Sequence, residues 1–169
     1  KRMFNWIHLR KQKHFFNSLT VISVENPIAL ELLKSKFPVL KDKTLLVTNG
    51  VNDEFLQNSF SVKKTFDEKE NIILSVGRIG ATDKNFEMLL NAFSNCNLQD
   101  WKLVFVGPIE NDFDKKVESI IKANPLLKNK IELVGNIDNR VTLYDYYNNS
   151  KICCLTSPFE SFGITFIEA

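Results

Sequence analysis

The 169-residue sequence lacks any hydrophobic run of about 18 residues, the length needed to cross a bilayer as a helix. It also lacks a strong excess of either charge: the formal net charge is +2, which argues against a nucleic-acid-binding protein with a wholly basic surface. No repeat, low-complexity segment or signal peptide stands out. The first residue is Lys1 rather than Met, so we expect a trimmed fragment, and the lack of a targeting signal in it says little about the full protein. Length and composition suit one ordinary globular domain or two incomplete ones.

Cysteine patterns for disulfides or metals are missing as well. Cys96, Cys153 and Cys154 are odd in number and lack the spacing of metal ligands. Two of them are adjacent within an apolar run, where neighbouring residues of a strand point to opposite faces. We therefore expect all three to be small buried hydrophobic residues in a reducing cytosol.

The glycine motifs of two common nucleotide-binding folds are absent. No G-x-G-x-x-G follows an apolar run, which weighs against a dinucleotide cofactor. The glycines and lysine of "GRIGATDK" are also misplaced for a G-x-x-x-x-G-K-[ST] phosphate loop.

What the sequence does contain is a regular alternation of β-rich and helix-like segments. The β-rich runs are 19–24, 44–49, 71–77, 101–107, 130–135 and 151–157, and the helix-like segments are 25–37, 85–96, 112–123 and 141–150. Strands with few polar positions that alternate with helices predict an α/β fold, a Rossmann-like parallel sheet with helices on both faces. The polar segment after Gly50 is too long for an ordinary connection and reads as a linker. We predict an α/β unit over 1–56, a linker over 57–70 and a second unit over 71–169.

Three β-rich runs end in glycine, at Gly77, Gly107 and Gly135. In open α/β sheets, ligands bind outside the carboxyl ends of the strands, where a missing side chain lets a ligand or backbone approach. Tight turns alone are the alternative explanation. After Gly77, the loop to the next helix carries Arg78 and Lys84, and the helix N-terminus adds free N–H groups, so the loop suits an anion of diphosphate size. Solvated surface cations are the simpler alternative.

The last segment, "SPFESFGITFIEA", repeats this arrangement after a later strand. Gly163 would allow a tight entry into a helix whose first amides, at Phe162, Gly163, Ile164 and Thr165, are free to bind an anion or sugar hydroxyls. Glu160 and Glu168 could accept hydrogen bonds from hydroxyls. If the segment were wholly helical they would lie about 12 Å apart, beyond the ~5–9.5 Å of a paired-carboxylate hydrolase. A helix-capping Glu160 and a solvated Glu168 are equally compatible with this spacing.

The segment "ESFGITFIEA" resembles the E-x7-E signature of retaining GT-B glycosyltransferases of the family 4, or group 1, type. Three further segments are similar to that family in the same order: "TLLVTNGVNDEF", "IILSVGRIGATDKNFEMLLNAF" and "KIELVGNIDNRVTLYDYYNNSKICCLTSPFESFG". The resemblance covers nearly the whole chain. It implies that 1–56 ends an acceptor-side domain, and that 71–169 is an incomplete nucleotide-sugar-binding domain.

The resemblance also implies roles for individual residues. Arg78 and Lys84 would hold the donor's diphosphate, Glu160 would contact the donor sugar near the reacting centre, and Glu168 would bind the ribose. The amides of 162–165 would hold sugar hydroxyls and phosphate, with Gly77 at the diphosphate loop. The segment Gly135, Asn136 and Ile137 would lie against the base. Asn85 departs from the pattern, because many members have glycine after this lysine.

The sequence and the resemblance together predict no metal and no cofactor. Asp112-Phe113-Asp114 forms a D-x-D triplet, which we interpret as the capped start of a helix. The basic, aromatic stretch 1–16 is interpreted as a solvated helix end, with peripheral contact to the inner face of a membrane as the alternative.

The predicted function is a retaining glycosyltransferase that moves a hexose from a UDP- or GDP-sugar to an acceptor hydroxyl. The acceptor would be a saccharide or lipid-linked, in cell-surface polysaccharide or glycolipid synthesis in the cytoplasm, without a nucleic-acid partner. The alternative is a non-catalytic nucleotide-sugar-binding or scaffold domain of the same fold. We expect the 169-residue chain alone to be inactive, because acceptor-binding residues would lie in other parts of the enzyme.

Overall fold

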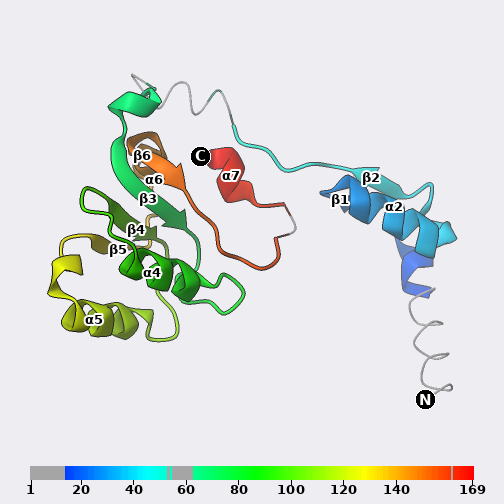
Figure 1. Ribbon diagram of the computed structural model, residues 1–169. Coiled ribbons are helices and arrows are strands. Elements are labelled where there is room, and N and C mark those ends of the chain that lie inside the picture. Colours follow the sequence, from blue (N-terminus) through cyan, green and yellow to red (C-terminus); the bar gives the residue numbers. More distant parts are fainter. Residues whose placement is uncertain (1–13, 53, 55–62, 161) are drawn as a thin grey trace, which may run out of the picture. The chain divides into compact units, whose positions relative to one another are not determined.

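The computed structural model describes residues 14–52, 54, 63–160 and 162–169 (Figure 1). Most of the basic aromatic stretch lies outside the described residues, and so do both of its interpretations, the solvated helix end and the alternative membrane contact. Residues 55–62 of the linker region also lie outside them. The fold divides into two compact units, Lys1–Gly50 and Val51–Ala169. The predicted boundaries after residues 56 and 70 remain predictions.

The first unit contains a short parallel strand pair with one helix between the strands. β1 (Ile22–Val24) pairs with β2 (Thr44–Leu46), and α2 (Pro27–Lys36) connects them, followed by a 3-10 helix at Pro38–Leu40. The helix begins where predicted, because Pro27 needs no amide partner and the Asn26 side chain accepts from the Ala29 amide at 3.0 Å.

The second unit is built on a four-stranded, wholly parallel sheet in the order β5-β4-β3-β6. Its strands are β3 (Glu70–Val76), β4 (Lys102–Val106), β5 (Ile131–Gly135) and β6 (Ser150–Cys153). All four fall within one residue of the predicted runs or inside them. The sequence-based prediction of a Rossmann-like α/β fold is confirmed.

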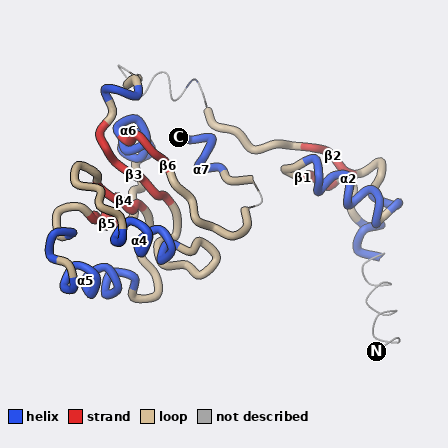
Figure 2. Tube along the Cα trace, viewed as in Figure 1, coloured by secondary structure: helices blue, strands red, loops and turns tan. Residues whose placement is uncertain are grey.

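Helices cover both faces of this sheet (Figure 2). On one face, α4 (Phe86–Asn95), α5 (Phe113–Ala123) and a 3-10 helix at Pro125–Leu127 pack on Leu103 and Phe105. On the other face, α6 (Arg140–Asn149) packs on Val104 and Val106. A 3-10 helix at Phe66–Glu68 precedes β3, and α7 (Ile164–Glu168) is the last element.

The cysteines test the predicted alternation of the strands. Cys154 packs with the α4–α5 face and Cys153 with the α6 face, so adjacent residues do point to opposite sides. Burial raises the pKa of the Cys153 thiol to about 11 and that of Cys154 in the same direction. The prediction of burial is wrong for Cys96, which is exposed just after α4.

Of two expectations about helix starts, the first needs correction and the second is confirmed. Asp112 precedes α5 as predicted, but its backbone is left-handed (φ 53°), so its side chain does not cap the helix and instead pairs with Lys115 at 2.9 Å. The last helix begins as predicted: Gly163 turns the chain with φ 73°, and α7 starts at Ile164. Because Glu160 lies before this helix, the distance of about 12 Å calculated for a wholly helical segment does not apply to Glu160 and Glu168.

Gly107 shows what a glycine at a strand end achieves here. A Cβ on Gly107, whose φ is +138°, would lie 1.8 Å from the carbonyl oxygen of Gly77. Backbone rather than ligand fills the space at this position, since the Gly77 amide also donates to the Val106 carbonyl at 3.0 Å. The glycines let the ends of β3 and β4 approach closely.

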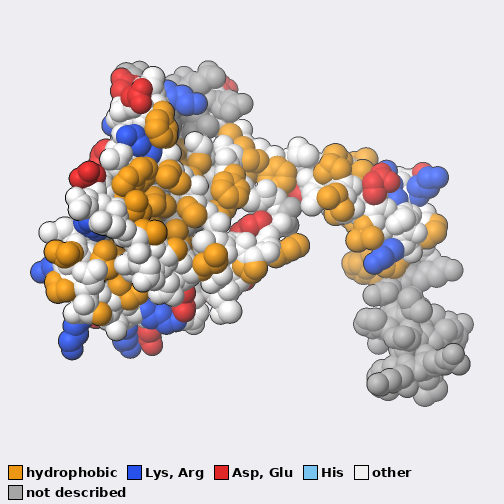
Figure 3. Space-filling model, viewed as in Figure 1, with side chains coloured by type: hydrophobic (Ala, Val, Ile, Leu, Met, Phe, Trp, Pro, Cys, Tyr) orange, Lys and Arg blue, Asp and Glu red, His pale blue; other side chains and the backbone are white. Residues whose placement is uncertain are grey.

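Apolar side chains gather over β6 and α7 on the face seen in Figure 3. Ile152 of β6 is 41% exposed, and Phe166 and Ile167 of α7 are 56% and 40% exposed. Among the described residues, no helix combines the length and hydropathy needed to span a bilayer.

Candidate functional site

The loops that follow β3 and β6 lie side by side, because these strands are neighbours in the sheet and run in the same direction. The Ser75 hydroxyl of β3 donates to the Cys154 carbonyl at 2.6 Å, and the Cys154 amide donates to the Leu74 carbonyl at 2.8 Å. Two segments that are some 80 positions apart in the sequence are thereby joined at the carboxyl edge of the sheet. This edge is where parallel α/β sheets bind ligands.

Lys84 and Glu160 meet at this edge. The Lys84 ammonium donates to Glu160 Oε1 at 2.6 Å, and about a quarter of each side chain is exposed. Hydrogen bonding, first from Lys84 and then from Ser157, holds the pKa of the Glu160 carboxyl below its usual value. The Ser157 hydroxyl itself is buried and has no partner of regular hydrogen-bond geometry among the described residues. The structure therefore brings together two of the three predicted catalytic residues.

Thr156 fixes the backbone on which this contact depends. Its hydroxyl lies 3.1 Å from the Lys84 carbonyl and 2.9 Å from the Asn85 carbonyl, so it ties the β6 loop to the start of α4. Sequence reasoning missed this residue. Its position directly before the Ser-x-x-Glu segment was the available signal, but a threonine there does not disclose a partner 71 positions away.

Asn85 occupies a position that demands an unusual backbone. Its φ is 51°, in the left-handed region that glycine adopts freely and that asparagine tolerates better than most other residues. The asparagine that stands here in place of the resembling family's glycine is therefore compatible with a left-handed backbone. The loop still delivers Lys84 to the site.

Arg78 lies in the same loop but does not join Lys84 and Glu160. Its guanidinium pairs with Asp83 at 2.9 Å and with Glu110 at 3.7 Å, and 54% of its side chain is exposed. An anion at this edge would have to compete with two carboxylates for Arg78. An anion could displace these carboxylates from Arg78, because ion pairs between solvent-exposed side chains are weak.

Glu168 is held by the helix on the other face of the sheet. Arg140 Nη1 donates to Glu168 Oε1 at 2.8 Å, and the Tyr147 hydroxyl donates to Glu168 Oε2 at 3.1 Å. Only 10% of the Glu168 side chain is exposed, so the alternative interpretation of Glu168 as a solvated helix residue is wrong. Burial, followed by the charge of Glu168, raises the pKa of Tyr147 well above its usual value.

The segment predicted to lie against the base leads directly into that helix. Gly135 ends β5, with its carbonyl accepting from the Gly107 amide at 2.8 Å, and Ile137 packs against the α6-side core. Asn136 donates to Asp138 at 2.6 Å, and Asn139 caps α6 immediately before Arg140. The predicted base segment and the predicted ribose ligand are thus connected through the first residue of α6.

The amides of Phe162, Gly163, Ile164 and Thr165 surround the start of α7. None of them donates to a backbone carbonyl of the described residues, while the Phe166 amide donates to the Gly163 carbonyl at 2.9 Å. Helix geometry leaves the first amides of a helix without partners inside the helix. Their binding role stays a prediction.

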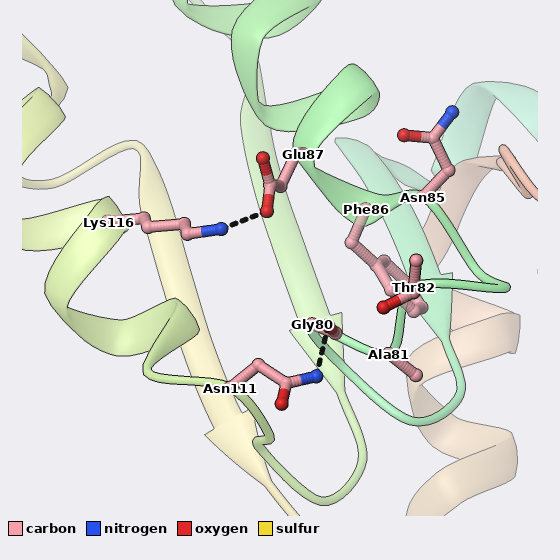
Figure 4. Close-up of a pocket in the computed structure, with 8 residues that line it drawn as sticks. All are labelled: Gly80, Ala81, Thr82, Asn85, Phe86, Glu87, Asn111 and Lys116. Atoms are coloured by element: carbon pink, nitrogen blue, oxygen red, sulfur yellow. Dashed lines mark hydrogen bonds and ion pairs between the residues drawn. The ribbon is translucent and has the colours of Figure 1, made fainter.

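A separate pocket of about 280 Å³ lies on the α5 side of the Arg78–Asn85 loop (Figure 4). Asn111 donates to the Gly80 carbonyl at 3.0 Å across it, Lys116 pairs with Glu87 at its rim, and Phe86 forms part of its wall. Its lining contains none of the predicted site residues. We assign the site to the Lys84–Glu160 edge, because there the charged groups converge from separate strands.

Metal-ligating groups do not converge in the part of the chain that the structure describes: no cluster of three or more His, Cys, Asp or Glu side chains could hold an ion. In the D-x-D triplet, Phe113 is fully buried and Asp112 is occupied by Lys115.

Comparison with known proteins gives a consistent set of relatives. The model of the family described as glycosyl transferases group 1 matches residues 57–169. The chain is 30% identical over 129 residues to the amylovoran biosynthesis glycosyltransferase AmsD of Erwinia amylovora, covering 75% of this chain and 34% of that protein. It is 29% identical over 160 residues to the capsular polysaccharide biosynthesis glycosyltransferase CapH of Staphylococcus aureus, covering 82% of this chain and 43% of the relative. The chain therefore spans less than half the length of either protein.

Among solved structures, Anabaena HepE in complex with UDP and glucose has a TM-score of 0.65 with this chain. The match covers 95% of this chain and 45% of HepE, at 16% identity. At that identity the likeness establishes the fold, which is the fold of the GT-B glycosyltransferases, in agreement with the parallel sheet described above.

Proposed function

Because the chain belongs to the glycosyl transferases group 1 family, we propose that it supplies the donor half-site of a retaining glycosyltransferase. The enzyme transfers a hexose from a UDP- or GDP-sugar to a hydroxyl of a saccharide or lipid-linked acceptor. The names of the two relatives, for amylovoran and capsular polysaccharide biosynthesis, support cell-surface polysaccharide as the product. The UDP and glucose named for HepE support a nucleotide-sugar donor. We place the reaction in the cytoplasm, with peripheral membrane contact for a lipid-linked acceptor.

The observation that carries the proposal is the contact between Lys84 and Glu160. Two loops 76 positions apart in the sequence bring a cation and a carboxylate to 2.6 Å at the carboxyl edge of a parallel sheet. A solvated surface pair would not need the additional tether from Thr156. The arrangement supports a role for Lys84 in binding the diphosphate, beside a carboxylate that can accept from sugar hydroxyls.

In the proposed reaction, the bond between the sugar's anomeric carbon and the diphosphate oxygen breaks. A bond to the acceptor oxygen forms on the same face, and the acceptor's proton passes to the departing diphosphate. Negative charge grows on the diphosphate as the bond breaks, and Lys84 and Arg78 stabilise that charge. Binding of the diphosphate would draw Lys84 from Glu160 and leave the carboxylate free for the donor sugar.

Charge stabilisation in this proposal comes from the two side-chain cations rather than from a divalent metal. Activity of the full-length protein should then persist when all divalent ions are chelated. An absolute requirement for manganese would contradict this assignment.

The experiment that tests the proposal is calorimetric titration of the full-length protein with UDP, GDP and ADP, without added metal. We expect one nucleotide to bind, and to bind at least about tenfold more weakly to a Lys84→Met variant, because one charged contact is lost. Lys115→Met, which removes an exposed ion pair at the start of α5, is the matched control. No binding of any of the three nucleotides to the folded wild-type protein would refute the donor-site assignment.

An activity assay on the full-length protein distinguishes a glycosyltransferase from a domain that only binds the nucleotide-sugar. Release of the nucleotide from the donor in the presence of an acceptor extract marks a transferase, whereas binding without turnover marks a scaffold domain. We expect the 169-residue chain by itself to show no turnover.

A further inference from the structure

We propose that Arg140 and Tyr147 are positioning residues, which hold the Glu168 carboxylate in the orientation that receives the ribose hydroxyls of the donor. This inference rests on the proposed function, since it deepens the role assigned to Glu168. It adds two residues of α6 that no motif in the sequence singled out.

The geometry is that of a two-point clamp on one carboxylate. Arg140 binds Oε1 at 2.8 Å and Tyr147 binds Oε2 at 3.1 Å, so each oxygen has its own donor. Arg140 is the first residue of α6, and Tyr147 lies seven positions further, which is two turns along the same side of the helix. A carboxylate held at both oxygens cannot rotate about its last bond without breaking a hydrogen bond.

The clamp leaves acceptor capacity for a ligand. An ionised carboxylate offers about four lone-pair sites, and the two recorded hydrogen bonds use one on each oxygen. One acceptor site therefore remains on each oxygen. Two neighbouring acceptor sites of fixed orientation suit a pair of vicinal hydroxyls, such as O2′ and O3′ of a ribose.

Tyr147 and Arg140, the two hydrogen-bond donors to Glu168, differ in how deeply they are buried. Tyr147 is 4% exposed and packed in the α6-side core, whereas the Arg140 side chain is 62% exposed. The pKa of Tyr147 is raised by burial and then by the charge of Glu168, so its hydroxyl stays protonated and remains a donor at neutral pH. Tyr147 therefore supplies the rigid point, and Arg140 supplies charge at the solvent edge.

The test compares ribose with 2′-deoxyribose on the same base. The full-length protein is titrated with UDP, GDP and ADP and with the 2′-deoxy form of each. We expect the nucleotide that binds to do so about tenfold more tightly than its deoxy form, because a hydrogen bond to a charged group is lost. Glu168→Ala should abolish this preference. Tyr147→Phe should reduce it about threefold or more, and should change nothing further when added to Glu168→Ala.

Matched variants separate positioning from general damage to α6. Tyr146→Phe makes the same chemical change one position away, where the ring is half-buried and faces Glu132 rather than Glu168, and should keep the full preference. Arg140→Met should lower the preference and Arg140→Lys should restore part of it. Thermal melting of each variant shows whether α6 still folds.

The results distinguish the two proposals. If no nucleotide binds the wild-type protein, both proposals are overturned. If a nucleotide binds and Glu168→Ala removes the ribose preference, but Tyr147→Phe and Arg140→Met on folded protein leave it intact, the clamp is refuted and the donor site stands. A loss of affinity that is equal for ribose and deoxyribose would also refute the clamp, because it marks a purely structural role.

Discussion

Glu160 is the side chain whose ionisation the structure constrains most directly at the proposed site. The hydrogen bond from Lys84 is the largest cause of its lowered pKa. We expect Lys84→Met to raise the pKa of Glu160 toward its ordinary value near 4.5, measured by NMR titration of the carboxyl carbon. Lys115→Met should leave it unchanged.

The same contact predicts a pH dependence of stability. Because the pKa in the folded state is lower than in the unfolded state, the contribution of Glu160 is fully present above the unfolded value and is lost as the pH falls through the folded one. The free energy of unfolding of the wild type should exceed that of Lys84→Met near neutral pH, by up to about 1 kcal/mol for a partly exposed pair. The difference should vanish in acid. A gap that widens in acid would contradict this sign.

Gly107 is a residue whose replacement the backbone forbids. A methyl group would collide with the Gly77 carbonyl oxygen at 1.8 Å, and the positive φ adds strain. Gly107→Ala should therefore lower the free energy of unfolding by at least about 2 kcal/mol, measured by urea denaturation. Gly50→Ala, with no atom within 4 Å of the added methyl, is the control and should stay within about 0.5 kcal/mol of the wild type.

At the residue scale, the sequence predicted which residues belong to the site better than it predicted which side chains they contact. Lys84 and Glu160 were predicted from motif positions, and the structure brings them into contact. Arg78 was predicted beside them, but its pairing with Asp83 and Glu110 depends on loop geometry that no spacing encodes. Thr156, Arg140 and Tyr147 were missed because their partners lie 21 to 72 positions away.

Among the elements, the two loops at the sheet edge depend on one threonine. Thr156→Val removes the hydroxyl that bridges to the Lys84 and Asn85 carbonyls but keeps the side-chain shape. We expect nucleotide affinity to fall several-fold, because Lys84 loses its fixed backbone, and Thr156→Ser to retain most of it. Calorimetry measures the affinity. An unchanged affinity in Thr156→Val would show that the Thr156 hydrogen bonds are not needed for nucleotide binding.

Element types were predictable, whereas their ends were not always. Apolar alternation located β3 to β6 and α4 to α6 because each buries a continuous face. The start of α7 was predictable, because Gly163 indicated a tight entry into the last helix and α7 begins at Ile164 directly after it. Left-handed backbone at Asp112 and Gly163 decides where α5 and α7 begin, and only the glycine announces that conformation in the sequence.

For the whole molecule, the two units differ in how much core they contain. The second unit buries residues from both faces of its sheet, whereas α2 in the first unit has no buried residue among those described. We expect residues 51–169 to unfold cooperatively in urea when expressed alone. Residues 1–50 alone should show no cooperative transition by circular dichroism.

The outcome could contradict this expectation in either direction. A cooperative transition in 1–50 would mean that the exposed Val21, Ile28 and Leu45 are not needed for packing elsewhere. Failure of 51–169 to fold would mean that the sheet needs the first unit. The sequence predicted two α/β units but could not rank their stability, because burial depends on what each apolar face meets.

The placement of β6 beside β3 has a consequence for how the chain matures during synthesis. One edge of β3 pairs with β4, but its other edge pairs with β6, and Cys154, directly after β6, follows Ser75 by 79 positions. During translation that edge of β3 is open, and an open strand edge invites pairing with other chains. The contact between Lys84 and Glu160 can form only after Glu160 has left the ribosome, so under the proposed function we expect nucleotide affinity to arise in one late step rather than gradually.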